Sequence, residues 1–451
     1  MFQHLQSNSF SEPIEQNADV ISCFSPDGFN FACTLQSQLL VWNVESKEIK
    51  NKFICDHIID SLGWSPDSEL IYCGMSRKNI IQIWSFNNPT WRCKISENPL
   101  SFVDVFWSPD SRHLLVVAEF HLKITVWSLV SSAIAVIENP KPIKNCLSFS
   151  HCERYLAVAE RRKCEDYISI YTCDTWEILK FFSVDTKDLS GIYFSPSDLV
   201  LGIVEAFTEE LKVVFYLIDG KIIGKYTRPS LFGLTCLSWN SNGNLITLGD
   251  YFGTVTILHS SNYDEIISYH EKESIECKNI VIYKVNQRSV KDEATSSNWE
   301  LYDVIKDRPF NFGALVSHSE KTKTKPKCGV HTLKYSHCGQ YLASLSGSLP
   351  KVVFIFDLNT FQLSSVIIHL YKIKDLSWHP EKPVLAICFG SGNLDLWTSS
   401  CCISICSPFK GDLSIINAQW CPIKDCLLLN GKDRSTLLHL PDFSSENSTT
   451  I

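Results

Sequence analysis

The hydrophobic positions of this chain recur in a fixed order that predicts β-strands in repeated groups. An aromatic residue ends a short apolar stretch and is followed by a polar turn, as in "CFSPDG" and "GWSPDS". An apolar run such as "HLLVVA" comes next, followed by a second polar turn and an alternating stretch such as "ITVW". Apolar runs and alternation of this length, bounded by turn residues, indicate short antiparallel strands.

The group occurs nine times, which indicates an internal repeat. Its aromatic residue stands at Phe24, Trp64, Trp107, Phe149, Phe194, Trp239, Tyr335, Trp378 and Trp420. Successive positions are 40, 43, 42, 45 and 45 residues apart, then 96, then 43 and 42. A weaker fourth strand follows in each repeat, so each repeat is expected to form a four-stranded antiparallel sheet. Such a sheet cannot bury its faces alone, and the core requires neighbouring repeats to stack.

This period, with a tryptophan closing the third strand, resembles the WD-repeat family of β-propellers. The Gly-His pair of that family is essentially missing here, and its Trp-Asp pair appears only in altered form, as Trp42-Asn43, Trp84-Ser85, Trp127-Ser128 and Trp397-Thr398. The side-chain hydrogen-bond network typical of the family is therefore expected to be mostly absent. The resemblance implies an all-β fold with one closed ring of about nine four-stranded blades. Seven blades plus extra sheets are the alternative.

Five segments are expected along the chain. They are an N-terminal segment that completes the last blade (1–20), blades one to six (21–258), an insertion (259–330), blades seven to nine (331–440) and a disordered tail (441–451). The insertion fills the interval of 96 residues and contains strand-like pieces and a basic loop with Lys321, Lys323, Lys325 and Lys327. It lacks the aromatic-plus-turn phrase, so we interpret it as an extension, such as a hairpin, from the sixth blade and not as a tenth blade.

Composition narrows the class of protein and of partner. With 45% hydrophobic and 20% charged residues, the 451-residue chain can bury a sizeable core. No apolar run approaches the roughly 20 residues that span a bilayer, so we expect a soluble cytoplasmic protein without a membrane partner. The net charge of −8 opposes general binding to nucleic acid. The densest group of the 19 cysteines contains no Cys-x-x-Cys pair, so no metal site is expected.

No sequence motif points to catalysis. The chain contains no phosphate loop, no His-Glu-x-x-His and no nucleophile elbow. Ser25 and Asp27 in "SPDG" are explained by the geometry of a turn. We therefore expect a protein that is not an enzyme, with no catalytic residue, no cofactor and no small-molecule substrate. A hydrolytic propeller is a less favoured alternative, because distant residues can converge on a central channel.

One set of turns carries unusual side chains. These turns join the second and third strands of repeats two to five, and they are expected on one rim of the disc. Their candidate partner-binding residues are Arg77, Lys78, Glu119, Phe120, His121, Arg161, Arg162, Lys163, Glu165, Asp166 and Phe207. The run "AERRKCEDYISIY" begins with charges of both signs, which fits a protein partner better than phosphate. These charges are expected to be solvent-exposed, with Phe120 and Phe207 as anchors. Ordinary charged hairpin tips are the alternative.

Four segments narrow the resemblance. "EFHLKITVWSL", "AERRKCEDYISIY", "DTKDLSGI" and "PTWRCKI" are similar to segments of a centrosomal and spindle-pole WD-repeat family, that of WD repeat-containing protein eight. Membership implies a non-catalytic cytoskeletal adaptor at the centrosome or spindle pole body. It also implies binding to a coiled-coil anchoring protein and, in fungi, to a minus-end-directed kinesin, so that microtubule minus ends are held at the pole of the mitotic spindle. A propeller scaffold of translation initiation or another cytoplasmic complex is the alternative function.

Overall fold

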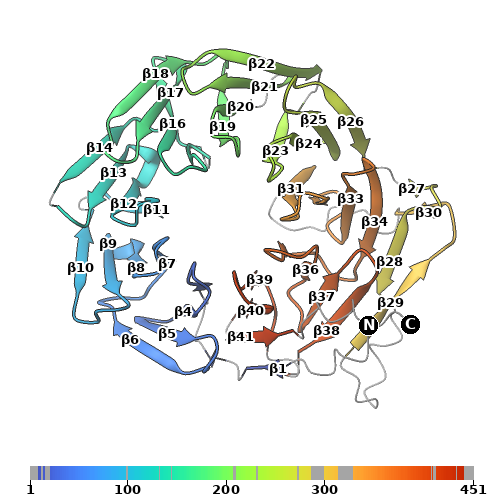
Figure 1. The fold of residues 1–451 in the computed structure, drawn as a ribbon, viewed down its shortest axis with the longest axis horizontal. Helices are drawn as coiled ribbons and strands as arrows, with labels where there is room; N and C mark the ends of the chain where they lie inside the picture. The colour runs from blue at the N-terminus through green and yellow to red at the C-terminus, as the bar shows by residue number, and fades with distance from the viewer. Residues whose placement is uncertain are drawn as a thin grey trace, which may run out of the picture. The chain divides into compact units, whose positions relative to one another are not determined.

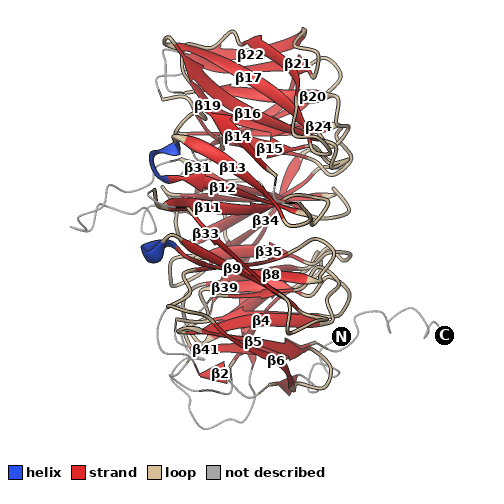
Figure 2. Ribbon diagram, turned by 90° about the vertical axis from the view of Figure 1, so that its left-hand side faces the viewer, coloured by secondary structure: helices blue, strands red, loops and turns tan. Residues whose placement is uncertain are grey.

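The computed structural model consists almost entirely of β-strands, as the alternation of hydrophobic and polar residues predicts. It describes residues 9–11, 14–15, 21–97, 100–131, 133–143, 145–206, 210–229, 232–271, 274–285, 299–312, 329–407, 409, 413–432 and 434–440. The helices among these residues are two single 3-10 turns, η2 (Ser76–Lys78) and η3 (Glu119–His121), coloured blue in Figure 2. No helix in the described part of the chain is long and apolar enough to cross a membrane.

Most of the described strands form nine groups of consecutive antiparallel strands, numbered here as blades 1 to 9 in chain order; blades 7 and 8 belong to one ten-stranded sheet. Blade 1 consists of β3 (Ser22–Phe24), β4 (Asn30–Leu35), β5 (Gln38–Asn43) and β6 (Ile49–Ile54). Blade 2 consists of β7 (Ser61–Trp64), β8 (Leu70–Met75), β9 (Ile80–Ser85) and β10 (Arg92–Ser96). Blade 3 consists of β11 (Phe102–Trp107), β12 (His113–Ala118), β13 (Lys123–Ser128) and β14 (Ile134–Glu138). Blade 4 consists of β15 (Leu147–Phe149), β16 (Tyr155–Arg162), β17 (Glu165–Thr172) and β18 (Ile178–Ser183). Blade 5 consists of β19 (Leu189–Phe194), β20 (Val200–Glu205), β21 (Glu210–Leu217) and β22 (Ile222–Pro229). Blade 6 consists of β23 (Leu234–Trp239), β24 (Leu245–Asp250), β25 (Thr254–His259) and β26 (Glu265–His270). Blade 7 consists of β31 (Val330–Tyr335), β32 (Tyr341–Ser346), β33 (Val352–Asp357) and β34 (Gln362–Ile368). Blade 8 consists of β35 (Asp375–Trp378), β36 (Leu385–Cys388), β37 (Asn393–Trp397) and β38 (Cys402–Cys406). Blade 9 contributes β39 (Asn417–Trp420), β40 (Cys426–Asn430) and β41 (Arg434–His439).

Blade 9 completes its sheet with the N-terminal segment. β1 (Ser9–Phe10) and β2 (Ile14–Glu15) both pair antiparallel with β41, the third strand of blade 9. They take the position that a fourth strand occupies in the other blades. The predicted fold class, an all-β propeller with nine four-stranded blades, is confirmed.

The chain divides into two compact units. The first unit comprises Met1–Leu114, Val285–Tyr302 and Tyr371–Ile451, and the second comprises Leu115–Lys284 and Asp303–Leu370. The division passes through β12, so the second unit holds most of blade 3 and all of blades 4 to 7.

In blades 1 to 3 the polar turn after the first strand is held by its own side chains. The hydroxyl of Ser25 donates to the carboxylate of Asp27, which in turn accepts the backbone N–H two residues later. Both residues therefore serve the turn, as predicted. The turn also links neighbouring blades of the first unit, because the backbone N–H of Asp27 donates to Ser68 Oγ at 3.0 Å, and that of Asp67 to Ser111 Oγ at 3.0 Å. This second role depends on stacking and has no local sequence signal.

The hydrophobic core lies between blades. In the second unit, Ile168 and Ile170 of β17 lie in one cluster with Leu201 and Ile203 of β20 and Val214 of β21, and all five are fully buried. Each such side chain contributes roughly 1.5 to 3 kcal/mol relative to full exposure. Each face of a blade is therefore stabilised by its neighbour, as expected for a repeat too small to fold alone.

The segment between blades 6 and 7 differs from its predicted form. β26 is the fourth strand of blade 6, so that blade continues beyond residue 258, where the sequence analysis ended it. β28 (Val281–Val285) pairs in parallel with β34, and β29 (Trp299–Ile305) pairs antiparallel with β38; both are the yellow strands beside these partners in Figure 1. β27 (Ser274–Ile275) pairs with β30 (Phe310–Asn311). The described strands therefore extend blades 7 and 8 and form neither a hairpin on blade 6 nor a tenth four-stranded sheet.

Two expectations concern residues outside the described ranges. They are the lysines of the predicted basic loop, residues 321–327, and the predicted disordered tail, residues 441–451. Both stay predictions.

A carboxyl group in blade 6 gives the fold a pH dependence. Glu271 follows β26, and its backbone N–H donates to the carbonyl of Gly253 at 3.0 Å. The residue is partly exposed, but both of its carboxylate oxygens are buried. Burial raises the pKa of Glu271 to about 7, and the negative charge of Asp250 adds to this rise.

We expect Glu271→Gln to raise the free energy of unfolding at pH 8 by up to roughly 3 kcal/mol. In the unfolded chain this carboxyl ionises near pH 4.5, whereas the folded protein keeps its proton until about pH 7. The unfolded state therefore binds fewer protons between these values, and the stability of the wild type falls as the pH rises, until both states are ionised. Urea unfolding at pH 5, 6, 7 and 8 measures the difference. Glu177→Gln at an exposed position is the control, and equal pH profiles of Glu271→Gln and wild type would contradict the prediction.

Candidate functional site

The turns that carry the predicted partner-binding residues lie at one end of each blade. Because the strands of blades 3, 4 and 5 follow the same order, the turns between their second and third strands share that end, together with the loops that lead to the next blade. Arg77 and Lys78 are exposed in η2, which belongs to the first unit. Phe207 lies outside the described residues. The site therefore rests on blades 3 to 5 of the second unit.

In blade 3 this turn presents an aromatic ring to solvent. Phe120 in η3 is 74% exposed, and Leu122 beside it is 55% exposed. Phe120 has φ 60° and ψ 14°, and His121 has φ 52°. Bulky residues rarely adopt the left-handed region, because the side chain then crowds the backbone. The turn therefore holds Phe120 outward at some cost in backbone energy, next to the exposed Glu119.

In blade 4 the turn is a two-residue hairpin. Lys163 and Cys164 have φ values of 50° and 65°, between the paired residues Arg162 and Glu165. Two successive residues with positive φ are typical of a type I′ turn, whose twist matches that of the flanking strands. Arg162, Lys163 and Glu165 are exposed, as predicted for a charged hairpin tip.

The neighbouring Asp166 is not exposed, and the prediction was wrong there. Asp166 is 1% exposed, and each of its carboxylate oxygens accepts a hydrogen bond from the ammonium group of Lys141 at 3.0 Å. Arg161 Nη1 adds a bond at 3.2 Å, and the backbone N–H of Leu189 donates at 2.6 Å. A buried carboxylate needs such partners, and here Arg161 belongs to the hairpin, whereas Lys141 and Leu189 come from segments outside the hairpin sequence.

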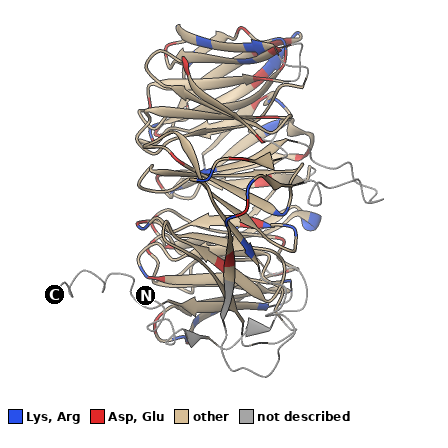
Figure 3. Ribbon diagram, turned by 90° about the vertical axis from the view of Figure 1, so that its right-hand side faces the viewer, with Lys and Arg blue, Asp and Glu red and all other residues tan. Residues whose placement is uncertain are grey.

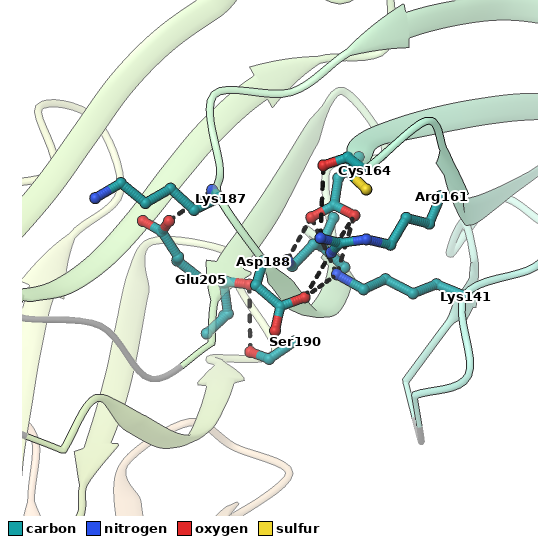
Figure 4. Close-up of polar contacts among 10 residues, drawn as sticks. Lys141, Arg161, Cys164, Lys187, Asp188, Ser190 and Glu205 are labelled. Atoms are coloured by element: carbon teal, nitrogen blue, oxygen red, sulfur yellow. Dashed lines mark hydrogen bonds and ion pairs between the residues drawn. The ribbon is translucent and has the colours of Figure 1, made fainter.

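A second carboxylate shares these cations. Asp188 accepts Lys141 Nζ at 2.7 Å and Arg161 Nη1 at 2.8 Å. Partial burial opposes its ionisation, but the bond to Lys141 and the charges of Lys141 and Arg161 outweigh that effect, so the pKa of Asp188 is lowered. Figure 4 shows the side chains of Lys141 and Arg161 pointing toward Asp188. Two carboxylates and two cations thus form a balanced cluster.

The other arginine of the hairpin also has a structural partner. Arg162 contacts the fully buried Glu160 through Nη2 at 2.6 Å, and Glu160 accepts a hydrogen bond from Ser169 as well. The Arg162 guanidinium lies 4.8 Å from the ring centroid of Phe181, and that ring stacks on Tyr167 with centroids 4.9 Å apart. Arg161 and Arg162 therefore stabilise buried charges, and they are not free to change without affecting the fold.

The loop from blade 4 to blade 5 is held at its other end by a similar cluster. Lys212, 7% exposed, lies 3.3 Å from Asp185 and 3.6 Å from Glu205, which is 4% exposed. The backbone N–H of Lys187 donates to Glu205 at 2.7 Å. We call Asp185–Asp188 the clasped loop, because ion pairs bind both of its ends. In Figure 4 the side chain of Lys187 extends away from Asp188, and this residue is exposed.

This arrangement provides a rigid surface and no catalytic group that we can identify. Among the described residues, no three or more His, Cys, Asp or Glu side chains are placed to hold a metal ion. The buried Asp166, Glu160 and Glu205 each have a cationic neighbour. Exposed charges of both signs at the hairpin tip of blade 4 suit recognition of another protein. Figure 3 shows basic and acidic positions interspersed along the ribbon on the right-hand side of Figure 1 as well.

The sequence analysis missed the clasped loop as a site. The short charged stretch "DTKD" between two apolar strands was the available signal, and it is also typical of an ordinary solvated loop. The partners of Asp188 lie 47 and 27 residues away, at Lys141 and Arg161. Their convergence follows from the stacking of blades and has no local spacing rule.

Comparison with known proteins identifies the repeat and one full-length relative. Residues 50–85 match the family "WD domain, G-beta repeat". The chain is 32% identical over 447 residues to "WD repeat-containing protein WRAP73" of Mus musculus, covering 96% of each chain. It is also 22% identical over 297 residues to "Uncharacterized WD repeat-containing protein C32H8.09" of Schizosaccharomyces pombe, covering 64% of this chain and 58% of that one.

Solved structures agree on the fold. The C-terminal WD40 domain of Sif2 has a TM-score of 0.52 at 11% identity, covering 96% of this chain and 99% of that one. A eukaryotic initiation factor has a TM-score of 0.56 at 12% identity, covering 87% of each chain. WD40 propellers are generally non-catalytic scaffolds that bind proteins, and this chain has the fold of such a propeller. By its full-length similarity, it belongs to the WD-repeat protein family that includes mouse WRAP73.

Proposed function

We propose that the chain is a non-catalytic scaffold of the centrosome or spindle pole body that anchors microtubule minus ends and supports organisation of the mitotic spindle. It would bind a coiled-coil anchoring protein and, in fungi, a minus-end-directed kinesin. The proposal rests on the four segments that resemble the family of WD repeat-containing protein eight. Three of them coincide with the candidate site: η3 with β13, the β16–β17 hairpin, and the clasped loop with the start of β19.

The candidate surface is defined by six of the exposed residues at this end of blades 3 to 5. They are Glu119, Phe120, Arg162, Lys163, Glu165 and Lys187. An aromatic ring beside charges of both signs is typical of protein interfaces, where aromatic residues and arginine supply much of the binding energy. The ion pairs beneath this surface fix its backbone before a partner arrives, which lowers the entropic cost of binding.

Localisation tests the proposal with two matched double variants of the tagged full-length chain. Phe120→Ser with Lys187→Glu alters the candidate surface. Val130→Ser with Lys221→Glu also replaces one exposed apolar residue by serine and one exposed lysine by glutamate, but in turns at the other end of blades 3 and 5. Both variants should melt like the wild type, because exposed substitutions usually change stability by less than about 0.5 kcal/mol.

We expect the wild type and the Val130→Ser/Lys221→Glu control to form discrete foci at spindle poles and to co-purify with a coiled-coil protein. Phe120→Ser/Lys187→Glu should lose both properties. Diffuse wild-type protein that sediments with ribosomes would contradict the proposal and favour the initiation-factor alternative. Normal foci for both double variants would leave the spindle-pole role intact and exclude the candidate surface.

A further inference from the structure

We propose that β18, the outer strand of blade 4, is the edge to which an extended segment of the protein partner adds as a fifth strand. The inference rests on the proposed function in taking a protein as the ligand. It concerns the outer strand of blade 4, which meets the candidate surface at Arg162, whose guanidinium lies over the ring of Phe181.

The chain already uses this arrangement in two other blades. β28 adds to the outer strand of blade 7, and β29 adds to the outer strand of blade 8. The covered strands are correspondingly buried, with four of the five residues of β38 buried, whereas five of the six residues of β18 are exposed. In the described part of blade 4, β18 is the last strand of its sheet.

The backbone of β18 offers its hydrogen-bonding groups to solvent. The N–H of Val184 donates to the carbonyl of Asp166 at 3.1 Å, which makes these residues a hydrogen-bonded pair of the antiparallel ladder. Bonded and non-bonded pairs alternate along such a ladder. In the register of β17 and β18, Phe181 and Ser183 therefore occupy non-bonded positions, and their N–H and C=O groups point away from β17.

The side chains of β18 make this an apolar edge. Ile178, Leu179 and Phe181 are 53%, 51% and 40% exposed, and Lys180 is the single charged residue of the strand. Natural edge strands usually carry several charges or a proline, because an open apolar edge favours aggregation. The outer strand of the next blade follows that rule, since β22 contains two basic residues and ends at Pro229. β18 lacks this protection.

An aromatic platform lies beside the open edge. Phe181 stacks on Tyr167 at an interplanar angle of 6°, and the Arg162 guanidinium lies over the same ring. Buried Glu160 fixes that guanidinium, so the platform is formed before any partner binds. Preorganised aromatic and arginine side chains are frequent hot spots of interfaces.

The occupant that fits is a short extended segment with alternating apolar residues and a carboxylate. Addition of a strand supplies main-chain hydrogen bonds, and pockets beside the edge select alternate side chains. An acidic residue opposite Lys180 would complement the single charge of β18, because opposite charges across neighbouring strands are stabilising. β29, with the sequence "WELYDVI", shows that the chain accepts a strand combining apolar and acidic residues. We therefore assign the edge to an extended segment of the partner protein, outside any helical part of it, that combines alternating apolar residues with an acidic residue opposite Lys180.

Hydrogen exchange of the full-length chain, alone and in complex with the partner that co-purifies with it, tests the edge directly. We expect exchange at the amide of Phe181 to slow about tenfold or more in the complex, because its N–H becomes bonded. The amides of β22 should not change. Unchanged exchange at Phe181 in the complex would overturn the inference.

Two variants test the same edge through binding. Leu179→Lys adds the kind of charge that natural edges use, and Ser183→Pro removes an outward N–H without touching the β17 ladder. Each should weaken the partner's affinity about tenfold or more while the melting temperature stays within about 2 °C of wild type. Ile222→Lys in β22 is the matched control, since Ile222 is 49% exposed. If one variant fails to fold, the other gives the result.

The outcomes separate this inference from the proposed function. The partner's identity and the spindle-pole foci test the function, whereas Phe181 exchange and the affinity of Leu179→Lys test the edge. Wild-type affinity of both β18 variants would overturn the edge and leave the function standing. A concentration-dependent dimer of the isolated chain that Ser183→Pro abolishes would identify a second copy as the occupant, and would also overturn the proposal.

Discussion

Replacement of Lys141 by methionine is expected to lower the free energy of unfolding by about 3 kcal/mol. The ammonium of Lys141 contacts both carboxylate oxygens of Asp166, whose side chain has no exposed surface. Methionine preserves the length and packing of the side chain but leaves the buried charge with less compensation. Breaking a buried ion pair usually costs about 3 to 5 kcal/mol. The lower end of this range applies here, because Arg161 Nη1 still lies 3.2 Å from Asp166 Oδ1 and compensates part of its charge.

Two further variants make this result specific. Lys94→Met breaks an ion pair with Asp56 at 2.7 Å, but both side chains of that pair are about half exposed, so the loss should stay below about 1 kcal/mol. Lys141→Met combined with Asp166→Asn should recover at least about half of the loss, because the amide removes the buried charge and still accepts the N–H of Leu189. Urea unfolding gives all four values. A loss in Lys141→Met no larger than that in Lys94→Met would contradict the structural role assigned to the cluster.

Much of the fold could be predicted because its signals are local. The alternation in "ITVW" and the turn residues in "SPDG" depend on a few neighbouring positions, so strand order and the number of blades could be predicted from the repeat. The partners of β28 and β29 could not be predicted in this way. An alternating segment indicates a strand, but its neighbour is chosen by contacts between distant segments, here the open outer edges of β34 and β38.

The candidate site shows the same limit. The exposure of Phe120 could be predicted, because a lone aromatic in a polar turn has no apolar neighbours in sequence. The burial of Asp166 could not, since its sequence context is as charged as that of an exposed hairpin. Its neutralising partner, Lys141, lies 25 residues away in the loop before β15. A charged run thus identified the region, but tertiary packing decided which of its charges are exposed.

Removal of residues 2–18 is expected to convert the chain into an aggregating protein. β1 and β2 pair with β41, and blade 9 has three further strands of its own. The N–H of Leu437 donates to Ser11 Oγ at 2.9 Å, and the hydroxyl of Thr436 donates to the carbonyl of Ser11 at 3.0 Å. Without this segment, β41 becomes an edge with unpaired N–H and C=O groups, which is a template for pairing with other chains.

Size-exclusion chromatography with light scattering measures the monomeric fraction of each truncation, and a thermal melt gives its stability. Removal of residues 441–451, the predicted tail, is the control and should leave both unchanged. Ser11→Pro is a milder test, because it removes two hydrogen bonds to Leu437, the N–H that donates to its carbonyl at 2.9 Å and the hydroxyl that accepts its N–H at 2.9 Å. We expect a lower melting temperature for this variant and no effect on the rest of the sheet. Closure of the blades into one ring through the N-terminal segment is itself a prediction, and a monomeric truncation lacking residues 2–18 that is as heat-stable as the full chain would count against it.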